Sequence, residues 1–126
     1  MRIFKNTWFR RFARRERIDD ETLKEAVARA DQGLIDADLG GSVIKQRIAK
    51  PGRGKSGGYR TIIIFKQGER AFFVYGFAKS RRNNIEKDEE EIFKKAAREL
   101  LALSDLQIGQ LILSGALTEV TNGDKT

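Results

Sequence analysis

Residues 59–79, YRTIIIFKQGERAFFVYGFAK, contain two apolar runs separated by a short polar turn. Residues 59–66 and 70–79 are rich in β-branched and aromatic side chains, which favour extended structure. The Gln67-Gly68 pair between them is typical of a tight hairpin. The stretch predicts two antiparallel strands in the middle of a sheet, and Gly76 indicates a bulge or a close approach. Strict alternation would put four side chains of the second strand on one face: Phe73, Tyr75, Phe77 and Lys79.

The segments around this hairpin predict an α+β fold of order β-α-α-β-β-β-α, in which two N-terminal helices pack on a small, mostly antiparallel sheet. Residues 2–5 alternate as a strand does, and apolar residues at helical spacing follow over 8–13 and 23–30. Residues 34–41 indicate a loop, residues 43–48 a strand, and residues 88–103 a long helix whose acidic start suits the helix dipole. A short helix over 105–113 and an extended segment over 117–120 would follow. We expect one domain over residues 1–121 and a frayed tail over 122–126.

Helical spacing also predicts which side chains of the helices are buried. Trp8 and Phe12 belong to an apolar stripe, so we expect them in the core rather than as platforms for stacked bases. The stripe predicted for the long helix consists of Ile92, Phe93, Ala96, Leu100 and Leu103.

Composition removes several classes of chemistry. The chain has 126 residues with no cysteine and no histidine, so disulfides, thiolate metal sites and the commonest general base are absent. Asp36 and Asp38 could be read as a metal pair, but two carboxylates in a predicted turn usually serve the turn. No apolar stretch reaches the length of a membrane span, and the first residues have no apolar signal core. We expect a cytoplasmic protein that uses no cofactor or metal and binds no membrane.

Positive charge is concentrated in the middle of the sequence. The net charge is +7, and residues 45–82 contain eleven Lys or Arg and a single acid, Glu69. Such a concentration favours a polyanionic partner, most simply nucleic acid, although a basic face kept for solubility is the alternative. Within this region, residues 50–58 form a glycine-rich basic loop, but its spacing does not match a nucleotide-binding P-loop, and a strand rather than a helix follows it.

Several motifs resemble those of the RelE-like toxins of bacterial toxin–antitoxin pairs, and most closely the HigB-like branch. They are KSGGYR (55–60) before an aliphatic strand, FAKS (77–80) after an aromatic strand, FKKAARELL (93–101) and LSGALTEV (113–120). The resemblance covers nearly the whole chain, and the GYR and AKS motifs together are fairly specific. Several members of this family have a Tyr shortly after the last strand's basic cluster, where this chain has Asn83, Asn84 and Ile85.

The resemblance implies an mRNA endonuclease that acts on the ribosome and is neutralised by a small antitoxin, often with a helix-turn-helix domain. Carried over by position, Arg60 and Lys79 would be the catalytic residues. The RNA-binding residues would be Lys45, Arg47, Arg53, Lys55, Tyr59, Arg81 and Arg82. On the α+β scaffold, Lys45 and Arg47 would share the sheet face that turns away from the N-terminal helices.

These residue types suit cleavage of RNA by its own 2′-hydroxyl. The planar fork of Arg60 can bind the scissile phosphate, and Lys79 can carry a proton in a chain that lacks histidine. Tyr59 or Tyr75 could stack a base or donate a hydrogen bond. The expected product is a 2′,3′-cyclic phosphate, formed without metal.

Structural roles without any part in catalysis or RNA binding remain open for the same residues. Arg60 could pair with an acid of the first helices, Lys79 could be a solvated strand end, and Tyr75 could be a core residue. Two other functions also remain open for the chain: a basic RNA-binding module that does not cut, and a relative of the same superfamily that poisons DNA gyrase.

Overall fold

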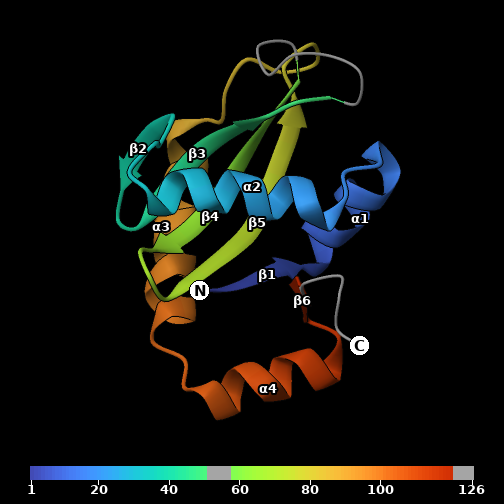
Figure 1. Cartoon of the computed structure of the whole chain (residues 1–126). Helices are drawn as coiled ribbons and strands as arrows, with labels where there is room; N and C mark the ends of the chain where they lie inside the picture. Colours follow the sequence, from blue (N-terminus) through green and yellow to red (C-terminus); the bar gives the residue numbers. More distant parts are fainter. Residues whose placement is uncertain (51–57, 121–126) are drawn as a thin grey trace.

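The computed structural model describes residues 1–50 and 58–120 (Figure 1). Arg53, Lys55 and the tail predicted over 122–126 therefore lie outside the described residues. The elements within the described ranges are β1 (Arg2–Asn6), α1 (Thr7–Glu16), α2 (Asp20–Asp31), β2 (Ala37–Gly40), β3 (Val43–Ile48), β4 (Tyr59–Lys66), β5 (Arg70–Ala78), α3 (Lys87–Leu101), α4 (Asp105–Ser114) and β6 (Leu117–Val120).

The strands form one mixed sheet in the order β2-β3-β4-β5-β1-β6. The β1–β5 pair is parallel, and the other pairs are antiparallel. The predicted β4–β5 hairpin is confirmed, with Gly68 at a φ of 74° and a Glu69 N to Lys66 O bond of 3.0 Å. The α+β class is confirmed as well. The predicted order lacked β2, whereas the short helix over 105–113 and the extended segment over 117–120 are confirmed as α4 and β6.

The prediction of a loop over residues 34–41 was wrong, because β2 lies within it and pairs antiparallel with β3. The connecting turn uses left-handed backbone at Gly40, Gly41 and Ser42, with φ of 84°, 60° and 64°. Four residues are too few to show an alternating pattern, so the strand exists because β3 offers it an edge. Pairing with β3, rather than the local sequence preference, makes this segment a strand.

Side-chain caps set the boundaries of the helices. The Asn6 side chain accepts a 2.7 Å bond from Phe9 N and so caps the start of α1. Asp19 does the same for α2, accepting from Thr22 N at 2.9 Å. Helices α3 and α4 both begin with a reciprocal capping box, which links Glu86 with Glu89 in α3.

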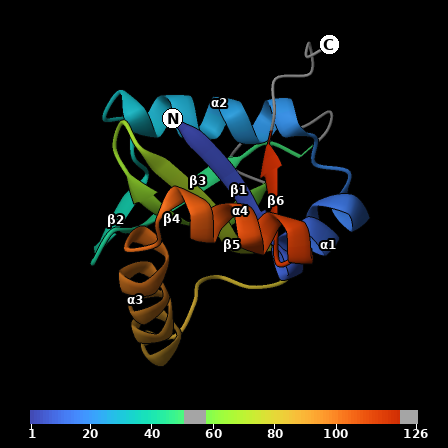
Figure 2. The same ribbon diagram turned by 90° about the horizontal axis from the view of Figure 1, so that it is seen from below.

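Helices cover both faces of the sheet. Figure 2 shows α2 and α3 on opposite sides of it. On the first side, Leu23 and Val27 of α2 and Phe9 of α1 pack on Ile63 and Phe73 of the sheet. On the second side, Phe93 and Ala97 of α3 belong to a separate cluster built on Ile62, Ile64 and Phe72. The sheet is therefore the middle layer between two cores.

Strand β5 contains a bulge at Val74. Tyr75 lies opposite Ile62 while Phe73 lies opposite Ile63, so Val74 is an extra residue in the ladder. Phe73 packs on the side of α1 and α2, and Phe77 packs on the side of α3. The prediction that Phe73, Tyr75 and Phe77 share one face was therefore wrong. The bulge changes which way every later side chain of β5 points.

Gly76 marks a close approach, as its position suggested. A Cβ built on Gly76 would lie 2.8 Å from Phe12 Cε2 and 3.2 Å from Phe9 Cε1. Phe12 is buried as predicted, with 4% of its surface exposed. Only a residue without a side chain lets α1 lie so near β5.

Two predicted core residues are exposed instead. Trp8 is 42% exposed, because it lies at the start of α1 where β1 has ended, and its ring rests on Phe12 and Tyr75 at the sheet's edge. Ile92 is 64% exposed, because the buried line of α3 runs through Phe93 and Ala97, one position further along.

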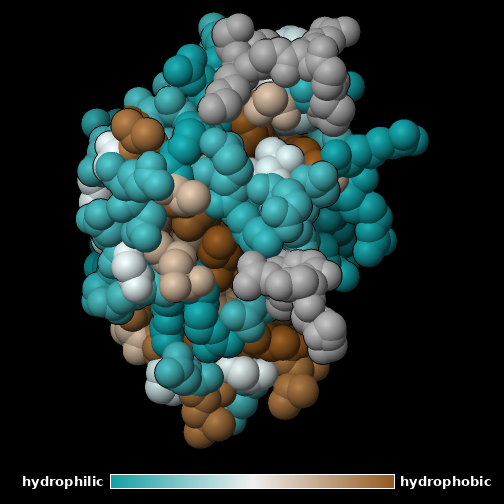
Figure 3. Space-filling model, viewed as in Figure 1, coloured by the Kyte–Doolittle hydropathy of each residue, from teal (hydrophilic) through white to brown (hydrophobic). Residues whose placement is uncertain are grey.

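Helix α4 buries one side and exposes the other. Ile108 is fully buried against the second core, whereas Leu106 and Leu113 are 73% and 89% exposed. Figure 3 shows apolar side chains gathered at the lower end of the molecule, where α4 lies. Among the described residues, no helix combines the length and apolar character that a membrane span requires.

Candidate functional site

Three neighbouring strands bring predicted site residues to one face of the sheet. Arg47 of β3 lies opposite Arg60 of β4, and Arg60 lies opposite Phe77 of β5. The row before it pairs Lys45 with Ile62 and Ile62 with Tyr75. Because residues two apart share a face, Lys45, Arg47 and Arg60 all lie on the α3 side. We call these residues, together with Lys79, the basic face.

Lys79 extends the same ladder beyond the last residue of β5. Its backbone N–H donates a 3.0 Å bond to Gly58 O, so the pairing of the two strands continues past Ala78. Alternation then puts Lys79 on the side of Phe77 and Arg60, since Tyr59 and Ala78 between them face the other way. The exposed ammonium of Lys79 donates to Asn83 Oδ1 at 3.1 Å.

Arg60 sits in a concentrated positive field. Burial lowers the pKa of its half-buried guanidinium below the ordinary value for arginine, and the charge of Arg47 lowers it further, while Asp36 opposes both. Asp36 lies 3.4 Å from Arg47 Nη2 and also accepts a 2.7 Å bond from Arg47 N. An anion bound at Arg60 would relieve this crowding of cations.

Two neighbouring amides hold the lysines of the basic face. Asn84 Oδ1 accepts a 3.1 Å bond from Lys45 Nζ, as Asn83 does from Lys79. An amide oxygen positions an ammonium without cancelling its charge. The sequence showed these asparagines only as a departure from the family's tyrosine. Their side-chain polarity was visible, but their partners depend on how the loop after β5 folds back.

Arg82 is engaged with protein groups. Its Nη1 donates to the Tyr75 hydroxyl at 2.7 Å, Nε donates to Asn84 O at 2.8 Å, and Nη2 pairs with Glu89. The hydrogen bond to Glu89 is the main reason that the pKa of Arg82 is raised. The guanidinium also lies over the rings of Tyr75 and Phe77, 5.7 and 5.8 Å from their centroids. The sequence predicted that Arg82 binds RNA. In this structure its hydrogen bond fixes the orientation of Tyr75.

Tyr59 lies on the opposite side of the sheet from Arg60. It is 1% exposed, packs edge-on against Phe12, and donates a 2.9 Å bond to Glu16 Oε1. Burial, followed by the contact with Glu16, raises its pKa to about 12. No base can stack on Tyr59 in this conformation.

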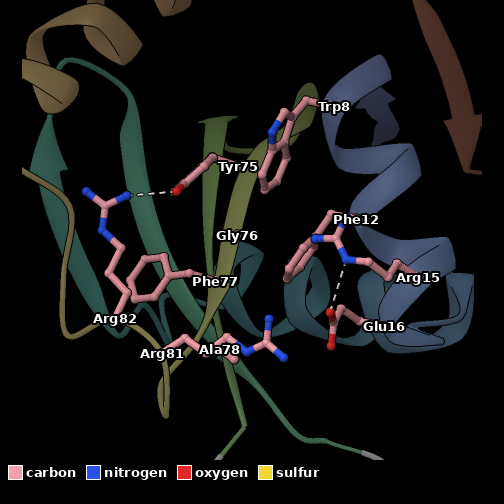
Figure 4. Close-up of a pocket in the computed structure, with 10 residues that line it drawn as sticks. All are labelled: Trp8, Phe12, Arg15, Glu16, Tyr75, Gly76, Phe77, Ala78, Arg81 and Arg82. Carbon is pink, nitrogen blue, oxygen red and sulfur yellow. Dashed lines mark hydrogen bonds and ion pairs between the residues drawn. The ribbon is translucent and has the colours of Figure 1, made fainter.

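A cleft of about 240 Å³ opens beside the basic face, between α1 and β5. Strand β1 pairs with β5 only as far as Phe73, and in the part of the chain that the structure describes no strand continues along that edge. Figure 4 shows Trp8 and Phe12 on one side of the cleft, Tyr75 and Phe77 on the other, and Arg81 toward its lower end. Sequence reasoning missed this cleft, although the one tryptophan of the chain, placed directly after a strand, was a signal for it.

Within residues 1–50 and 58–120, no three Asp or Glu side chains cluster as the ligands of a metal ion would.

Comparison with known proteins identifies the family. A search of curated proteins gives no match. A family model described as the RelE toxin of the RelE/RelB toxin–antitoxin system matches residues 1–120, which is almost the whole chain. The sheet with its basic face and covering helices agrees with that match. The chain therefore belongs to the RelE toxin family of toxin–antitoxin systems.

Proposed function

We propose that this toxin is a metal-independent endoribonuclease of the HigB-like branch, which cleaves ribosome-associated mRNA in the cytoplasm. Membership of the RelE family supports the link to translation and to RNA cleavage. One structural observation carries the proposal: Arg47, Arg60 and Lys79, which are separated in sequence, share one face of the sheet. A phosphodiester bound there would meet cations from three adjacent strands.

In this mechanism, Arg60 binds the scissile phosphate and stabilises the charge that builds up as the 2′-hydroxyl attacks. Lys79 carries the proton given up by the 2′-hydroxyl to the 5′-oxygen, which departs as the P–O5′ bond breaks. The products are a 2′,3′-cyclic phosphate on the upstream fragment and a 5′-hydroxyl on the downstream fragment. Lys45 and Arg47 hold the neighbouring phosphates. We also assign phosphate contacts to Arg53 and Lys55, which lie outside the described residues.

The partner that restrains the toxin is an antitoxin, as the family implies. We propose a small helical antitoxin with a helix-turn-helix domain. Its toxin-binding segment would carry acidic side chains, because the basic face needs a complementary charge when RNA is absent.

The direct test incubates the purified protein with ribosomes and a defined mRNA and maps new 5′ ends. Arg60→Ala should slow cleavage by about 100-fold or more, because one transition-state contact is lost. Lys79→Ala should slow it by a similar or larger factor, the usual contribution of a proton-transfer group. Circular dichroism and thermal melting of each variant show whether the fold is retained.

Lys66→Ala is the matched control. Lys66 lies on the same face of β4 as Arg60 but at the other end of the strand. Its exposed Nζ is 3.5 Å from Glu69 Oε1. Its removal lowers the net charge by the same amount and should leave cleavage unchanged. Full activity of folded Arg60→Ala would refute its role, and binding of RNA without new 5′ ends would support a binding module instead. Inhibition of DNA supercoiling without RNA cleavage would identify a gyrase poison.

A further inference from the structure

The cleft between α1 and β5 has no role in the chemistry proposed above. We infer that it is a slot for one unpaired nucleobase of the RNA, next to the nucleotide whose phosphate Arg60 binds. The inference rests on the proposed function for the identity of the polymer. The slot itself follows from the rings, charges and dimensions of the cleft.

The rings in the cleft are arranged as a stacking platform. The centroids of Trp8 and Tyr75 are 4.5 Å apart with 35° between the planes, and Trp8 lies 5.3 Å from Phe12 at 18°. Trp8 nevertheless keeps 42% of its surface exposed. Stacking on aromatic side chains is how proteins bind unpaired bases, because every base has a π-face. A base that covers the indole would bury apolar surface that the fold leaves in water.

Tyr75 is held in place before any ligand arrives. Arg82 donates to its hydroxyl at 2.7 Å, and Glu89 fixes Arg82 from the other side. Since the hydroxyl oxygen accepts that bond, its own proton can be donated to an acceptor on a base edge. The slot is thus pre-organised and has one directional polar group, which lowers the cost of ordering on binding.

The dimensions of the cleft suit one base. Sites for drug-sized ligands span about 300–1,000 Å³, and this cleft, at about 240 Å³, is smaller. Phe77, which lines it, lies directly opposite Arg60 on the next strand. Neighbouring strands are about 4.8 Å apart, so a base in the slot and a phosphate on Arg60 can belong to adjacent parts of one RNA strand.

The charges around the cleft favour an anionic polymer such as nucleic acid over a purely apolar protein segment. Arg15 and Arg81 line it, and the single lining acid, Glu16, is occupied by bonds from Arg15 and from the Tyr59 hydroxyl. The phosphates that accompany a base would therefore meet cations. A protein partner that anchors on Trp8 is the competing occupant, and the experiment below separates the two.

Trp8 is the only tryptophan in the chain, so its fluorescence reports on the slot directly. The probe is a short single-stranded oligonucleotide with 2′-O-methyl sugars, which cannot be cleaved because the attacking hydroxyl is blocked. A second oligonucleotide, identical except for abasic sites, keeps the phosphates and removes the bases. The first should quench Trp8 and bind about 5- to 150-fold more tightly than the second, the range for one stacked base.

Variants are compared by the anisotropy of a labelled oligonucleotide. Trp8→Ala should lose the preference for the normal over the abasic oligonucleotide, and Tyr75→Phe should keep most of it. Leu113→Ala removes an exposed apolar side chain on α4, which does not line the cleft, and should change nothing.

The outcomes separate the slot from the nuclease. If Trp8→Ala cleaves and binds like the wild type and Trp8 is not quenched, the slot is refuted while the proposed function stands. If the quench and the base preference occur without any cleavage, the slot is supported and the nuclease fails. If Trp8 responds to a bound antitoxin and to neither oligonucleotide, the cleft is a protein-binding site and the inference is overturned.

Discussion

Phe12 requires a neighbour without a side chain, and Gly76 is that neighbour. A methyl group at residue 76 would meet Phe12 Cε2 at 2.8 Å and Arg60 O at 3.3 Å. The Phe12 ring cannot easily move away, because it is buried among Phe9, Tyr59 and Trp8. Any added atom at this position therefore pushes α1 away from β5.

Gly76→Ala should destabilise the protein by about 1–3 kcal/mol, the range for an overpacked site. Urea denaturation followed by circular dichroism measures the loss. Gly109→Ala is the control: it lies within α4 and a Cβ there meets nothing within 4 Å. That substitution should stabilise the protein by about 0.5–1 kcal/mol, because alanine favours a helix more than glycine does. Equal stability of the two variants would show that the close approach is not tight.

The carboxylate of Glu89, in the first turn of α3, has two roles. Glu89 accepts from Glu86 N in the capping box and pairs with Arg82. The backbone bond is the larger cause of its lowered pKa, and the hydrogen bond from Arg82 adds to it. The same carboxylate thus ends the loop after β5 and, through Arg82, positions Tyr75.

Glu89→Gln keeps the cap, since glutamine also suits that position, but removes the charge. The folded pKa of Glu89 lies below its ordinary value of 4.5, so its charge stabilises the fold above that pH and the contribution is lost as the pH falls. The variant should therefore be less stable near neutral pH by about 0.5–1 kcal/mol, as for a pair partly screened by water. Urea unfolding of both proteins at several pH values should show the difference shrinking in acid. A difference that stays constant with pH would contradict this account.

The sequence predicted the elements whose pattern is local. The runs 59–66 and 70–79 became β4 and β5, and the helical spacing over 8–13 and 23–30 lies within α1 and α2. Strand β2 was missed because its four residues gain order only from β3. The bulge at Val74 was missed because it depends on register with β4, which no single-strand pattern contains.

The same division applies to the candidate site. Lys45, Arg47 and Arg60 followed from alternation within strands, so the basic face could be predicted. The role of Arg82 and the exposure of Trp8 could not be predicted from the sequence. Both depend on three-dimensional facts: where the loop after β5 folds back, and where β1 stops along β5.

At the scale of the molecule, charge is divided between faces. The net charge is +7, and α2 and α3 both begin with acidic residues, whereas Arg47, Arg60 and Lys79 lie near the ends of β3, β4 and β5. The binding of a single strand of nucleic acid should therefore weaken as salt rises.

Salt dependence distinguishes phosphate contacts from stacking. For single strands, the slope of log affinity against log salt changes by about 0.7 per phosphate contact. Arg60→Ala should reduce the magnitude of the slope by roughly that amount. Trp8→Ala should weaken binding with the slope unchanged, and Lys66→Ala should alter neither. A reduced slope in Trp8→Ala would mean that its loss also displaces a phosphate.

The pairing of β1 with β6 has a consequence for biosynthesis. Residue 3 lies opposite residue 120, so the outer edge of the first strand is closed by the last strand that the structure describes. Residue 3 leaves the exit tunnel of a translating ribosome long before residues 117–120 do. The outer edge of β1 therefore stays open while the residues between these two strands are made, and the sheet is completed only when β6 emerges.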